Sequence, residues 1–336
     1  MARLRFSILL PVYNGEDVLG ETVRSILSQS FTDYELIICD DASTDDTPGV
    51  VESFSDPRIR FFRNSKNLGY PGNLENCRKK ASGDILYLMG QDDILRRGLL
   101  QETHDIFATN EEIGAVTRPF FWFDEDIGKP LRVTPQLNPQ RDEVVRITDS
   151  FERVFTVFET LGQLSGLALR RRFMDRPFHQ DIFPCHIYPF ASIFKKHPIV
   201  FLRDYSVAVR ISSSQTRKIS SIYEKSPLQS WVQMFESVFP EKEFEDLRRY
   251  AIRTFLATDY LGLIQIRNYA RYRYLLREIG FFLKYRWENI FSPKFWFFAL
   301  GTMITPPFLL IPLVDWYKNK INARNYGNYL SFQPAL

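Results

Sequence analysis

The chain has 336 residues, of which 45% are apolar and 25% are charged, so it can bury one large core or two smaller ones. This balance excludes global disorder, and a net charge of +3 is too small to indicate a nucleic-acid-binding protein. The cysteines, Cys39, Cys77 and Cys185, lie far apart in the sequence. Their spacing favours free thiols in a reducing compartment and excludes a zinc knuckle.

The N-terminal sequence contains no separate cleavable apolar region, because M-A-R-L-R runs directly into a strand pattern. We therefore expect no signal peptide and a cytosolic location. The aromatic residues are unevenly distributed: the chain has 30 Phe, and many of them lie in the last third. The C-terminal third is therefore expected to differ in character from the rest.

Strand patterns that end in polar residues alternate with helical patterns at the start of the chain. Strands are predicted at 6–12, 34–39, 58–63 and 85–89, and helices at 16–28 and 73–81. This alternation is typical of an α/β fold with a parallel sheet. Ligands bind such sheets beyond the carboxyl ends of the strands. We therefore expect the polar residues that follow the strands to gather at one edge: Tyr13, Asp40–Asp41 and Asp92–Asp93.

Two adjacent carboxylates, Asp92 and Asp93, follow the strand predicted at 85–89. Two negative charges side by side repel each other, so the pair suits a place where a divalent cation neutralises it. With no His or Cys nearby, an oxygen-only pair favours Mg²⁺ or Mn²⁺. A solvated turn is the alternative interpretation, because aspartate is common in turns. The second acidic cluster, at 40–46, favours the cation site.

Four motifs follow one another in the first part of the chain. They are P-V-Y-N at 11–14, S-I-L-S-Q-S-F-T-D-Y-E-L-I-I-C-D-D-A-S-T-D-D-T at 25–47, N-L-G at 67–69 and Q-D-D at 91–93. Together they resemble the nucleotide-sugar domain of inverting family 2 glycosyltransferases of the GT-A fold. The resemblance covers about the first 115 residues. It implies a Rossmann-like mixed, mainly parallel sheet with flanking helices, in which 1–115 binds the nucleotide sugar and 116–218 binds the acceptor.

The resemblance also implies roles for individual residues in the donor half. Tyr13 packs against the nucleotide base and Asp41 binds the base or the ribose, while Pro11 and Asn14 shape that pocket. An aromatic face supports a flat base, and a carboxylate accepts hydrogen bonds from base N–H groups or ribose hydroxyls. For Tyr13, an ordinary core position is the alternative interpretation.

The resemblance implies that the acidic pair, Asp92 and Asp93, corresponds to the metal site of the family. Asp93 is expected to bind Mn²⁺ or Mg²⁺ directly, and Asp92 is expected to lie nearer the sugar or ribose. Gln91 stands where the family often has an additional acid, which predicts weaker metal binding. The cation would stabilise the diphosphate leaving group.

Inversion in a single displacement also needs a base that takes the proton of the acceptor hydroxyl. In the resembled family this base is an Asp or Glu early in a helix of the acceptor half. Here the corresponding position holds Cys185 and His186, and the expected carboxylate is missing. His186 and Asp181 are the candidate bases, with Asp175 a more distant third. A structural histidine is the alternative interpretation of His186.

The acceptor half contains a further strand pattern at 113–123, in which Arg118 or Trp122 could line the acceptor side. The sequence S-S-S-Q-T-R-K at 212–218 has the composition of a flexible lid. Arg217 or Lys218 of this segment could reach the diphosphate, because cations in mobile loops bind such groups. A solvated basic loop is the alternative interpretation.

Residues 219–336 read as a helical C-terminal region. The segment 295–314 carries no charge and reaches the length of about 20 residues that a bilayer span requires. Pro306, Pro307 and Pro312 argue against a straight spanning helix, because each removes a backbone donor. Flanking cations and aromatic residues favour a monotopic or re-entrant anchor on the inner face of the cell membrane. A homodimer interface, helices that pack on the catalytic domain and a true span are the alternatives.

The sequence therefore predicts a metal-assisted glycosyltransferase that uses a UDP- or dTDP-linked sugar. Its expected acceptor is a saccharide or a polyprenyl-linked saccharide in bacterial surface polysaccharide assembly. One alternative is a nucleotidyltransferase, although P-V-Y-N-G-E-D stands where a Gly-rich triphosphate loop would be. The other is a non-catalytic, membrane-bound scaffold that keeps the fold and has lost the base.

Overall fold

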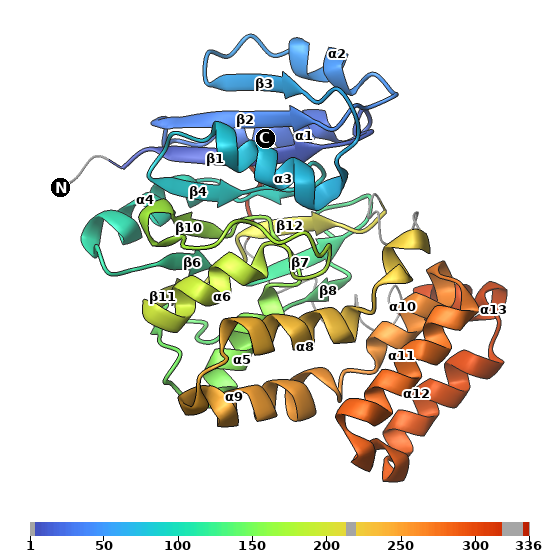
Figure 1. The fold of residues 1–336 in the computed structure, drawn as a ribbon. Helices are drawn as coiled ribbons and strands as arrows, with labels where there is room; N and C mark the ends of the chain where they lie inside the picture. Colours follow the sequence, from blue (N-terminus) through green and yellow to red (C-terminus); the bar gives the residue numbers. More distant parts are fainter. Residues whose placement is uncertain (1–3, 213–219, 318–331, 336) are drawn as a thin grey trace. The chain divides into compact units, whose positions relative to one another are not determined.

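The computed structural model describes residues 4–212, 220–317 and 332–335. The chain divides into two compact units, a first unit of residues 1–213 with 326–336 and a second unit of residues 214–325. The first unit combines strands with helices, and the described part of the second consists of helices (Figure 1). Arg217 lies outside the described residues.

A mixed sheet of eight strands forms the centre of the first unit, in the order β3-β2-β1-β4-β10-β6-β11-β9 (Figure 1). Strands β1 to β4 run parallel, as their alternation with helices predicts, and the antiparallel β10 makes the sheet mixed. The strands are β1 (Phe6–Val12), β2 (Tyr34–Asp40), β3 (Ile59–Arg63), β4 (Ile85–Leu88), β6 (Ala115–Thr117), β9 (Glu143–Val145), β10 (Ala168–Arg170) and β11 (Ile199–Phe201).

Strand β1 is rich in apolar residues because helices cover the faces of a parallel sheet and leave little room for polar side chains. It pairs with β2 on one side and with β4 on the other. The register sets Val12 opposite Asp40 of β2 and Leu9 opposite Leu88 of β4. The carboxyl ends of the three strands therefore reach the same edge of the sheet.

A second sheet has the strand order β5-β12-β7-β8. Its strands are β5 (Ile94–Leu95), β12 (Val207–Arg210), β7 (Phe120–Phe123) and β8 (Arg132–Val133). The single strand predicted at 113–123 is in fact two strands, β6 and β7, which belong to different sheets. The chain changes sheet at Arg118 and Pro119, where proline has no N–H for a ladder hydrogen bond.

The helices of the first unit connect these strands, and α3 packs against β1 and β2. Pro71 lies in the first turn of α3, where a missing N–H costs nothing because the first-turn donors have no partner within the helix. The helical segments are α1 (Leu19–Leu27), α2 (Thr47–Glu52), α3 (Gly69–Lys80), α4 (Leu99–Thr109), α5 (Phe151–Thr160), the 3₁₀ turn η1 (Arg171–Phe173) and α6 (Ile187–Lys196).

Residues 332–335 also belong to the first unit and lie along β5. The Ala335 N–H donates to the Leu95 carbonyl at 3.1 Å, and the Arg97 N–H donates to the Gln333 carbonyl at 2.9 Å. The Phe332 ring meets the Phe121 ring edge to face, with centroids 5.0 Å apart. This segment therefore adds hydrogen bonds to the strand that directly follows Asp93.

The described helices of the second unit bury aromatic side chains together with Asn289. The Asn289 side chain accepts from the Tyr260 hydroxyl at 2.7 Å and donates to the carbonyls of Ala257 and Phe282, each at 3.0 Å. The segments are η2 (Ser220–Glu224), α8 (Pro227–Val238), η3 (Lys242–Phe244), α9 (Glu245–Tyr250), η4 (Ala251–Leu256), α10 (Leu261–Tyr269), α11 (Tyr272–Tyr285), η5 (Trp287–Phe291), α12 (Pro293–Ile304) and α13 (Pro307–Tyr317).

The uncharged segment 295–314 forms parts of two helices, because α12 ends at Ile304 and α13 begins at Pro307. Pro306 and Pro307 have no N–H to continue the helix, which explains the break. Among the helices of the described ranges, none combines the length and the apolar character needed to cross a bilayer.

Candidate active site

Tyr13 and Gln91 connect the ends of β1 and β4. The Tyr13 N–H donates to Gln91 Oε1 at 2.7 Å, and Gln91 Nε2 donates back to the Tyr13 carbonyl at 3.2 Å. The amide side chain supplies both the acceptor and the donor for this pair of bonds, whereas an ionised carboxylate would only accept. From the sequence, Gln91 is notable only because it stands where the family that the chain resembles often has an additional acid. The structure shows that Gln91 fixes the backbone of the predicted base-binding tyrosine.

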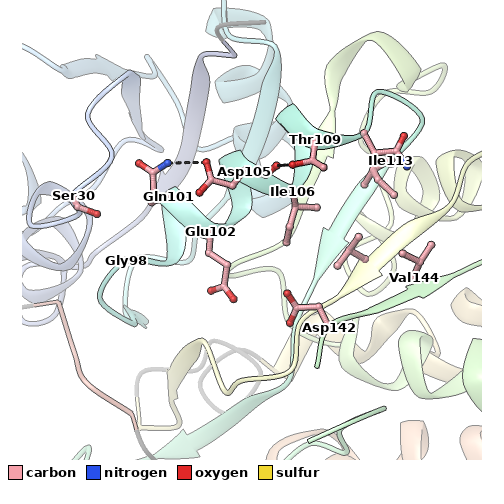
Figure 2. Close-up of a pocket in the computed structure, with 12 residues that line it drawn as sticks. Ser30, Gly98, Gln101, Glu102, Asp105, Ile106, Thr109, Ile113, Asp142 and Val144 are labelled. Atoms are coloured by element: carbon pink, nitrogen blue, oxygen red, sulfur yellow. Dashed lines mark hydrogen bonds between the residues drawn. The ribbon is translucent and has the colours of Figure 1, made fainter. Parts of the chain in front are cut away.

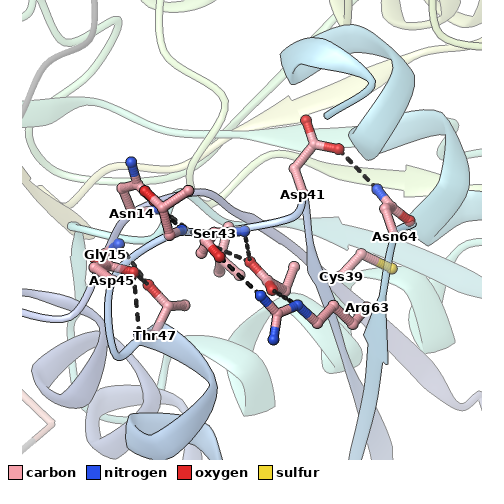
Figure 3. Close-up of polar contacts among 12 residues, drawn as sticks. Asn14, Gly15, Cys39, Asp41, Ser43, Asp45, Thr47, Arg63 and Asn64 are labelled. Atoms are coloured by element: carbon pink, nitrogen blue, oxygen red, sulfur yellow. Dashed lines mark hydrogen bonds and ion pairs between the residues drawn. The ribbon is translucent and has the colours of Figure 1, made fainter. Parts of the chain in front are cut away.

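Asp41 follows β2 and is 2% exposed. Its Oδ1 accepts a hydrogen bond from the Asn64 side chain at 2.8 Å (Figure 3). The same oxygen accepts from the Leu68 N–H, also at 2.8 Å. The Asp41 N–H donates to the Val12 carbonyl at 2.8 Å. These bonds hold the carboxylate at the edge of the sheet where Tyr13 follows β1.

The side chain of Asp40 is bonded to protein groups that hold the loop after β2. Its Oδ1 accepts from the Ser43 N–H at 3.1 Å and from the Ser43 hydroxyl, and its Oδ2 pairs with Arg63 Nε at 3.1 Å (Figure 3). The Ser43 hydroxyl also receives the Asn14 N–H at 2.9 Å. Asp40 therefore orders the loop that carries Asp41.

Asn14 and Pro11 lie beside this loop. Asn14 has a φ of 48°, a left-handed conformation that asparagine adopts more readily than most residues. Its side-chain Oδ1 accepts the Thr44 N–H at 2.9 Å, so the predicted pocket-shaping residue binds the loop after β2 (Figure 3). Pro11 stands in β1 opposite Cys39.

Asp93 is 1% exposed, and Asp92 before it is half-buried. The Ser165 hydroxyl donates to Asp93 Oδ2, and the Arg210 N–H donates to Oδ1 at 3.1 Å. Burial raises the pKa of Asp93 well above its usual value, and the neighbouring Asp92 charge raises it further. The fold thus holds a carboxylate whose charge is costly without a cation close by.

The acidic pair fits a divalent cation that is shared with a ligand. A carboxylate has about four lone-pair positions, and two on Asp93 accept the bonds from Ser165 and Arg210. Two positions remain for a metal. No cluster of three or more His, Cys, Asp or Glu side chains suited to a metal occurs among the residues that the structure describes. Mg²⁺ commonly binds through one or two carboxylates together with substrate phosphates, and this donor set matches that pattern.

His186 precedes α6 and is 4% exposed. Its Nε2 lies 2.8 Å from the Leu161 carbonyl, and its Nδ1 lies 3.3 Å from the Tyr70 hydroxyl. A carbonyl oxygen only accepts, so Nε2 carries the proton and Nδ1 faces Tyr70. Burial lowers the pKa of His186 to about 4. The side chain is therefore neutral at pH 7 and enclosed by protein groups.

The two aspartates near this histidine have different surroundings. Asp181 is 3% exposed, and its Oδ1 accepts the Phe183 N–H at 3.3 Å in the turn before α6. Asp175 pairs with Lys196 Nζ at 2.6 Å and accepts from the Ser192 hydroxyl at 2.7 Å. The Lys196 and Ser192 bonds give Asp175 a structural role in holding α6.

Arg118 does not line an open acceptor surface, contrary to one expectation from the sequence. Its side chain is fully buried, and its guanidinium donates to backbone carbonyls of the segment 160–165. Trp122 is half-buried, with the Arg132 guanidinium 3.5 Å from its ring centroid. The break between β6 and β7 explains the difference, because it turns Arg118 into the interior.

An open pocket of about 780 Å³ lies along α4 (Figure 2). Glu102, Asp105 and Asp142 line it together with apolar side chains such as Ile106 and Val144. Among the described residues, none of those predicted for donor binding, metal binding or catalysis lines this pocket. The candidate site is therefore defined by the sheet edge and by the buried groups behind Asp93.

Part of the chain is similar in sequence to proteins that are already known. The Glycosyl transferase family 2 profile matches residues 7–176, just over half of the chain. The putative glycosyltransferase EpsE of Bacillus subtilis is 30% identical over 136 residues, which are 40% of this chain and 49% of that protein. The Escherichia coli protein WfgD, a UDP-Glc:alpha-D-GlcNAc-diphosphoundecaprenol beta-1,3-glucosyltransferase, is 38% identical over 88 residues, or 26% of this chain and 35% of that one.

A similarity to a solved structure extends over more of the chain. The S. aureus TarS 1-349 structure in complex with UDP-GlcNAc has a TM-score of 0.62 and 15% identity, and the match covers 93% of this chain and 92% of that one. At this identity the similarity shows the fold. In contrast, the match to EpsE and WfgD spans half or less of their length. The family profile matches more than half of this chain, and the chain therefore belongs to glycosyltransferase family 2.

Proposed function

We propose that this protein transfers a sugar from a UDP- or dTDP-linked donor to a saccharide acceptor with inversion. The supporting observation is that Tyr13, Asp41 and the Asp92–Asp93 pair follow three adjacent parallel strands and reach one edge of the sheet. Residues 1–115 bind the donor, and residues 116–218 bind the acceptor. Both assignments extend the family membership to the activity of the whole chain.

The donor nucleotide binds at the ends of β1 and β2. The Tyr13 ring supports the base, and Pro11 and Asn14 shape the pocket around it. Asp41 uses Oδ2 to accept from the base or the ribose, because its Oδ1 already holds Asn64 and Leu68. The bonds between Gln91 and the Tyr13 backbone keep the aromatic side chain in place before the donor arrives.

Asp93 holds Mn²⁺ or Mg²⁺, and Asp92 lies nearer the sugar. When bound, the cation neutralises negative charge on the diphosphate. Asp93 supplies oxygen positions that are already directed by Ser165 and Arg210, so little reorganisation accompanies binding. We assign Arg217, on sequence grounds alone, to the diphosphate as a second cationic group.

We assign the base that accepts the acceptor proton to Asp181 rather than to His186. Burial disfavours the charged imidazolium that His186 would become on accepting a proton, and its Nε2–H is already bonded to the Leu161 carbonyl. Its remaining lone pair faces the Tyr70 hydroxyl. Asp181 is a carboxylate in the turn before α6, close to where family members place the base. Asp181→Asn should then lower kcat strongly with little change in donor KM, whereas His186→Gln should keep most of the activity.

The acceptor is a saccharide carried on a polyprenyl diphosphate or on a polymer. The name of WfgD describes a transferase that acts on a diphosphoundecaprenol-linked sugar, and this supports a lipid-linked acceptor here. Such an acceptor lies at a membrane, so the protein would work at the inner face of the cell membrane in surface polysaccharide assembly. An exposed apolar surface on the second unit supports this location.

This apolar face comprises residues of η5, α12 and α13. Its most exposed members are Phe291, Phe297, Ile304 and Phe308, each at least 73% exposed. Further exposed members are Trp287, Ile290, Leu300, Leu309, Leu313, Trp316 and Tyr317. A patch of this kind marks a protein or membrane contact. Trp287, Trp316 and Tyr317 suit the headgroup region of a bilayer, where aromatic residues concentrate.

The geometry of the apolar face favours insertion into one leaflet. A helix of 12 residues such as α12 is about 18 Å long at 1.5 Å per residue, shorter than the roughly 30 Å hydrocarbon core. From Pro293 to Tyr317 the charged residues are Lys294 and Asp315, one near each end. We therefore propose that the helices of residues 220–317 hold the protein on a membrane surface, with α12 and α13 lying in the interface.

Vesicle flotation tests the membrane contact. The full chain should float with phosphatidylglycerol vesicles, and Phe297→Ser/Ile304→Ser/Phe308→Ser should reduce the bound fraction at least about 10-fold. Val144→Ser, which removes an exposed apolar residue of the first unit, is the matched control and should float as the parent does. If the triple variant floats unchanged but loses a dimer seen by sedimentation, the apolar face is an interface between two copies.

Release of nucleoside diphosphate tests the transferase. The full chain is incubated with Mn²⁺, with a saccharide or polyprenyl-linked acceptor, and with UDP-, dTDP- or GDP-linked sugars in turn. We expect release from a UDP or dTDP donor that requires the acceptor and Asp93. Donor binding without turnover under every condition would favour the non-catalytic scaffold, and release of pyrophosphate from a nucleoside triphosphate would favour the nucleotidyltransferase.

A further inference from the structure

The loop of residues 160–166, between α5 and β10, is held from its backbone side by a buried arginine. Arg118 Nε donates to the Ser165 carbonyl at 2.5 Å, and its terminal nitrogens donate to the carbonyls of Gln163 at 2.8 Å and Thr160 at 3.4 Å. The guanidinium is fully buried, so these carbonyls replace the water that it would otherwise bind. Breaking these contacts would leave a charge unsolvated, which ties the loop to Arg118.

His186 holds the same loop at a second point. Its Nε2–H donates to the Leu161 carbonyl at 2.8 Å. A neutral imidazole has one donor, and that donor is used here. The histidine at the start of α6 and the arginine between β6 and β7 therefore bind neighbouring carbonyls of one loop, although the two residues lie far apart in the sequence.

The side chain of Ser165 connects this loop to Asp93. The Gly90 N–H donates to Ser165 Oγ at 2.8 Å, so the hydroxyl hydrogen is free to point elsewhere. It donates to Asp93 Oδ2. The Gly166 N–H also bonds the Leu88 carbonyl at 2.9 Å. The loop is thus bonded to the end of β4 and to the predicted metal ligand at once.

The backbone of the loop is tightly packed at Gly166, so a larger residue would not fit there. This residue has a φ of +83°, which disfavours any other residue type. A Cβ there would lie 2.6 Å from Val207 Cγ2 and 2.9 Å from Arg118 Nε. The loop backbone therefore packs directly against the guanidinium and cannot shift without moving it.

We propose that the 160–166 loop positions the Asp93 carboxylate for the cation and the diphosphate, and that Ser165, Arg118 and His186 are the positioning residues that act through it. This assignment rests on the proposed function, because it names what supports the metal ligand. It also gives His186 a role that its enclosed ring can fulfil. Groups that orient a metal ligand typically change metal affinity or activity 10- to 100-fold when removed.

Calorimetric titration of Mn²⁺ into the full chain with saturating UDP tests this role directly. Ser165→Ala should raise the apparent Kd for Mn²⁺ about 10-fold, because Asp93 loses the bond that directs Oδ2. Thr156→Ala is the matched control: it removes a hydroxyl that bonds within α5, to the Glu152 carbonyl, and should leave the Kd unchanged. Equal Kd values for parent and Ser165→Ala would overturn the proposal.

Two substitutions of His186 separate positioning from a merely structural effect. His186→Leu fills the space without a donor and should raise the Kd for Mn²⁺ several-fold. His186→Gln restores an N–H donor and should recover most of that loss. Arg118→Lys keeps the charge but cannot reach three carbonyls, so it should resemble His186→Leu. Equal effects of the leucine and glutamine variants would contradict the role of the His186 donor.

Hydrogen–deuterium exchange gives a readout without metal or nucleotide. The Gly90 amide donates to Ser165 Oγ, so Ser165→Ala should speed its exchange while amides inside β1 stay protected. If the parent binds no Mn²⁺ with UDP, the donor assignment of the proposed function fails, and exchange alone decides whether the loop orders the end of β4. Unchanged exchange at Gly90 in Ser165→Ala would overturn the loop's role by itself.

Discussion

The two units depart from the usual distribution of polar and apolar side chains in opposite directions. In the first unit, the charged side chains of Arg118 and Asp93 lie inside and have hydrogen-bond partners. In the second, Phe297 and Ile304 lie outside with 74% and 77% of their surface exposed. Buried polar groups and exposed apolar patches are the exceptions that carry information about binding.

Under the proposed function, the two units prepare a surface for a ligand in two different ways. Burying the Asp93 carboxylate costs free energy, which a bound cation would offset. In the first unit this unfavourable electrostatic energy is concentrated at one residue. Exposing the apolar face costs free energy that a lipid surface would return over a broad area. We infer that point mutations will act sharply in the first unit and cumulatively on the apolar face of the second.

The largest expected effect is that of Asp93→Asn. Loss of the metal ligand should lower kcat/KM for the donor about 1000-fold, because the leaving diphosphate is no longer neutralised. The same variant should unfold at an equal or higher temperature than the parent, since it removes a buried charge with a raised pKa. Steady-state kinetics and a thermal melt of the same preparation check both parts. An active variant would remove Asp93 from the metal site.

A matched pair on α12 tests the contrast within one helix. Phe295 is fully buried and Phe297 is 74% exposed. Phe295→Ala should cost about 3 kcal/mol of unfolding free energy, because it leaves a cavity. Phe297→Ala should change stability by less than about 0.5 kcal/mol. Urea unfolding of both variants measures the difference, and equal destabilisation would mean that the exposed face is packed in solution.

The buried His186 predicts a loss of stability in mild acid. Its pKa is about 4 in the folded chain and 6.5 ordinarily, so the unfolded chain binds the extra proton between these values. The stabilising contribution is complete above pH 6.5 and disappears as the pH falls toward 4. Between pH 7.5 and 5 the parent should lose about 2 kcal/mol more than His186→Gln. Urea titrations at both pH values check this, and equal losses would contradict the burial of His186.

The smallest expected effect concerns Gln91. Gln91→Ala removes both bonds to the Tyr13 backbone and should raise the donor KM about 5- to 10-fold, with a smaller change in kcat. Gln91→Glu keeps the acceptor for the Tyr13 N–H but loses the donor. Its donor KM should therefore lie between that of the parent and that of Gln91→Ala. A donor KM equal to that of the parent in Gln91→Ala would show that Tyr13 does not depend on this support.

The sequence by itself determined the parallel strands β1 to β4 and the edge at which Tyr13, Asp41 and Asp93 lie. These features are local: an apolar run forms a strand, and the polar residues that end it must lie where the strand ends. Family membership followed from the same motifs, because they occur together and in the order that resembles family 2 glycosyltransferases.

Only the tertiary structure decided the roles of Gln91, Arg118 and His186. Each of them bonds a segment at least 25 residues away in the sequence, so no local pattern could reveal its partner. The same reason explains the division of 113–123 between two sheets. A side chain's chemistry is read from its sequence, but its burial and its partners arise only when distant segments pack together.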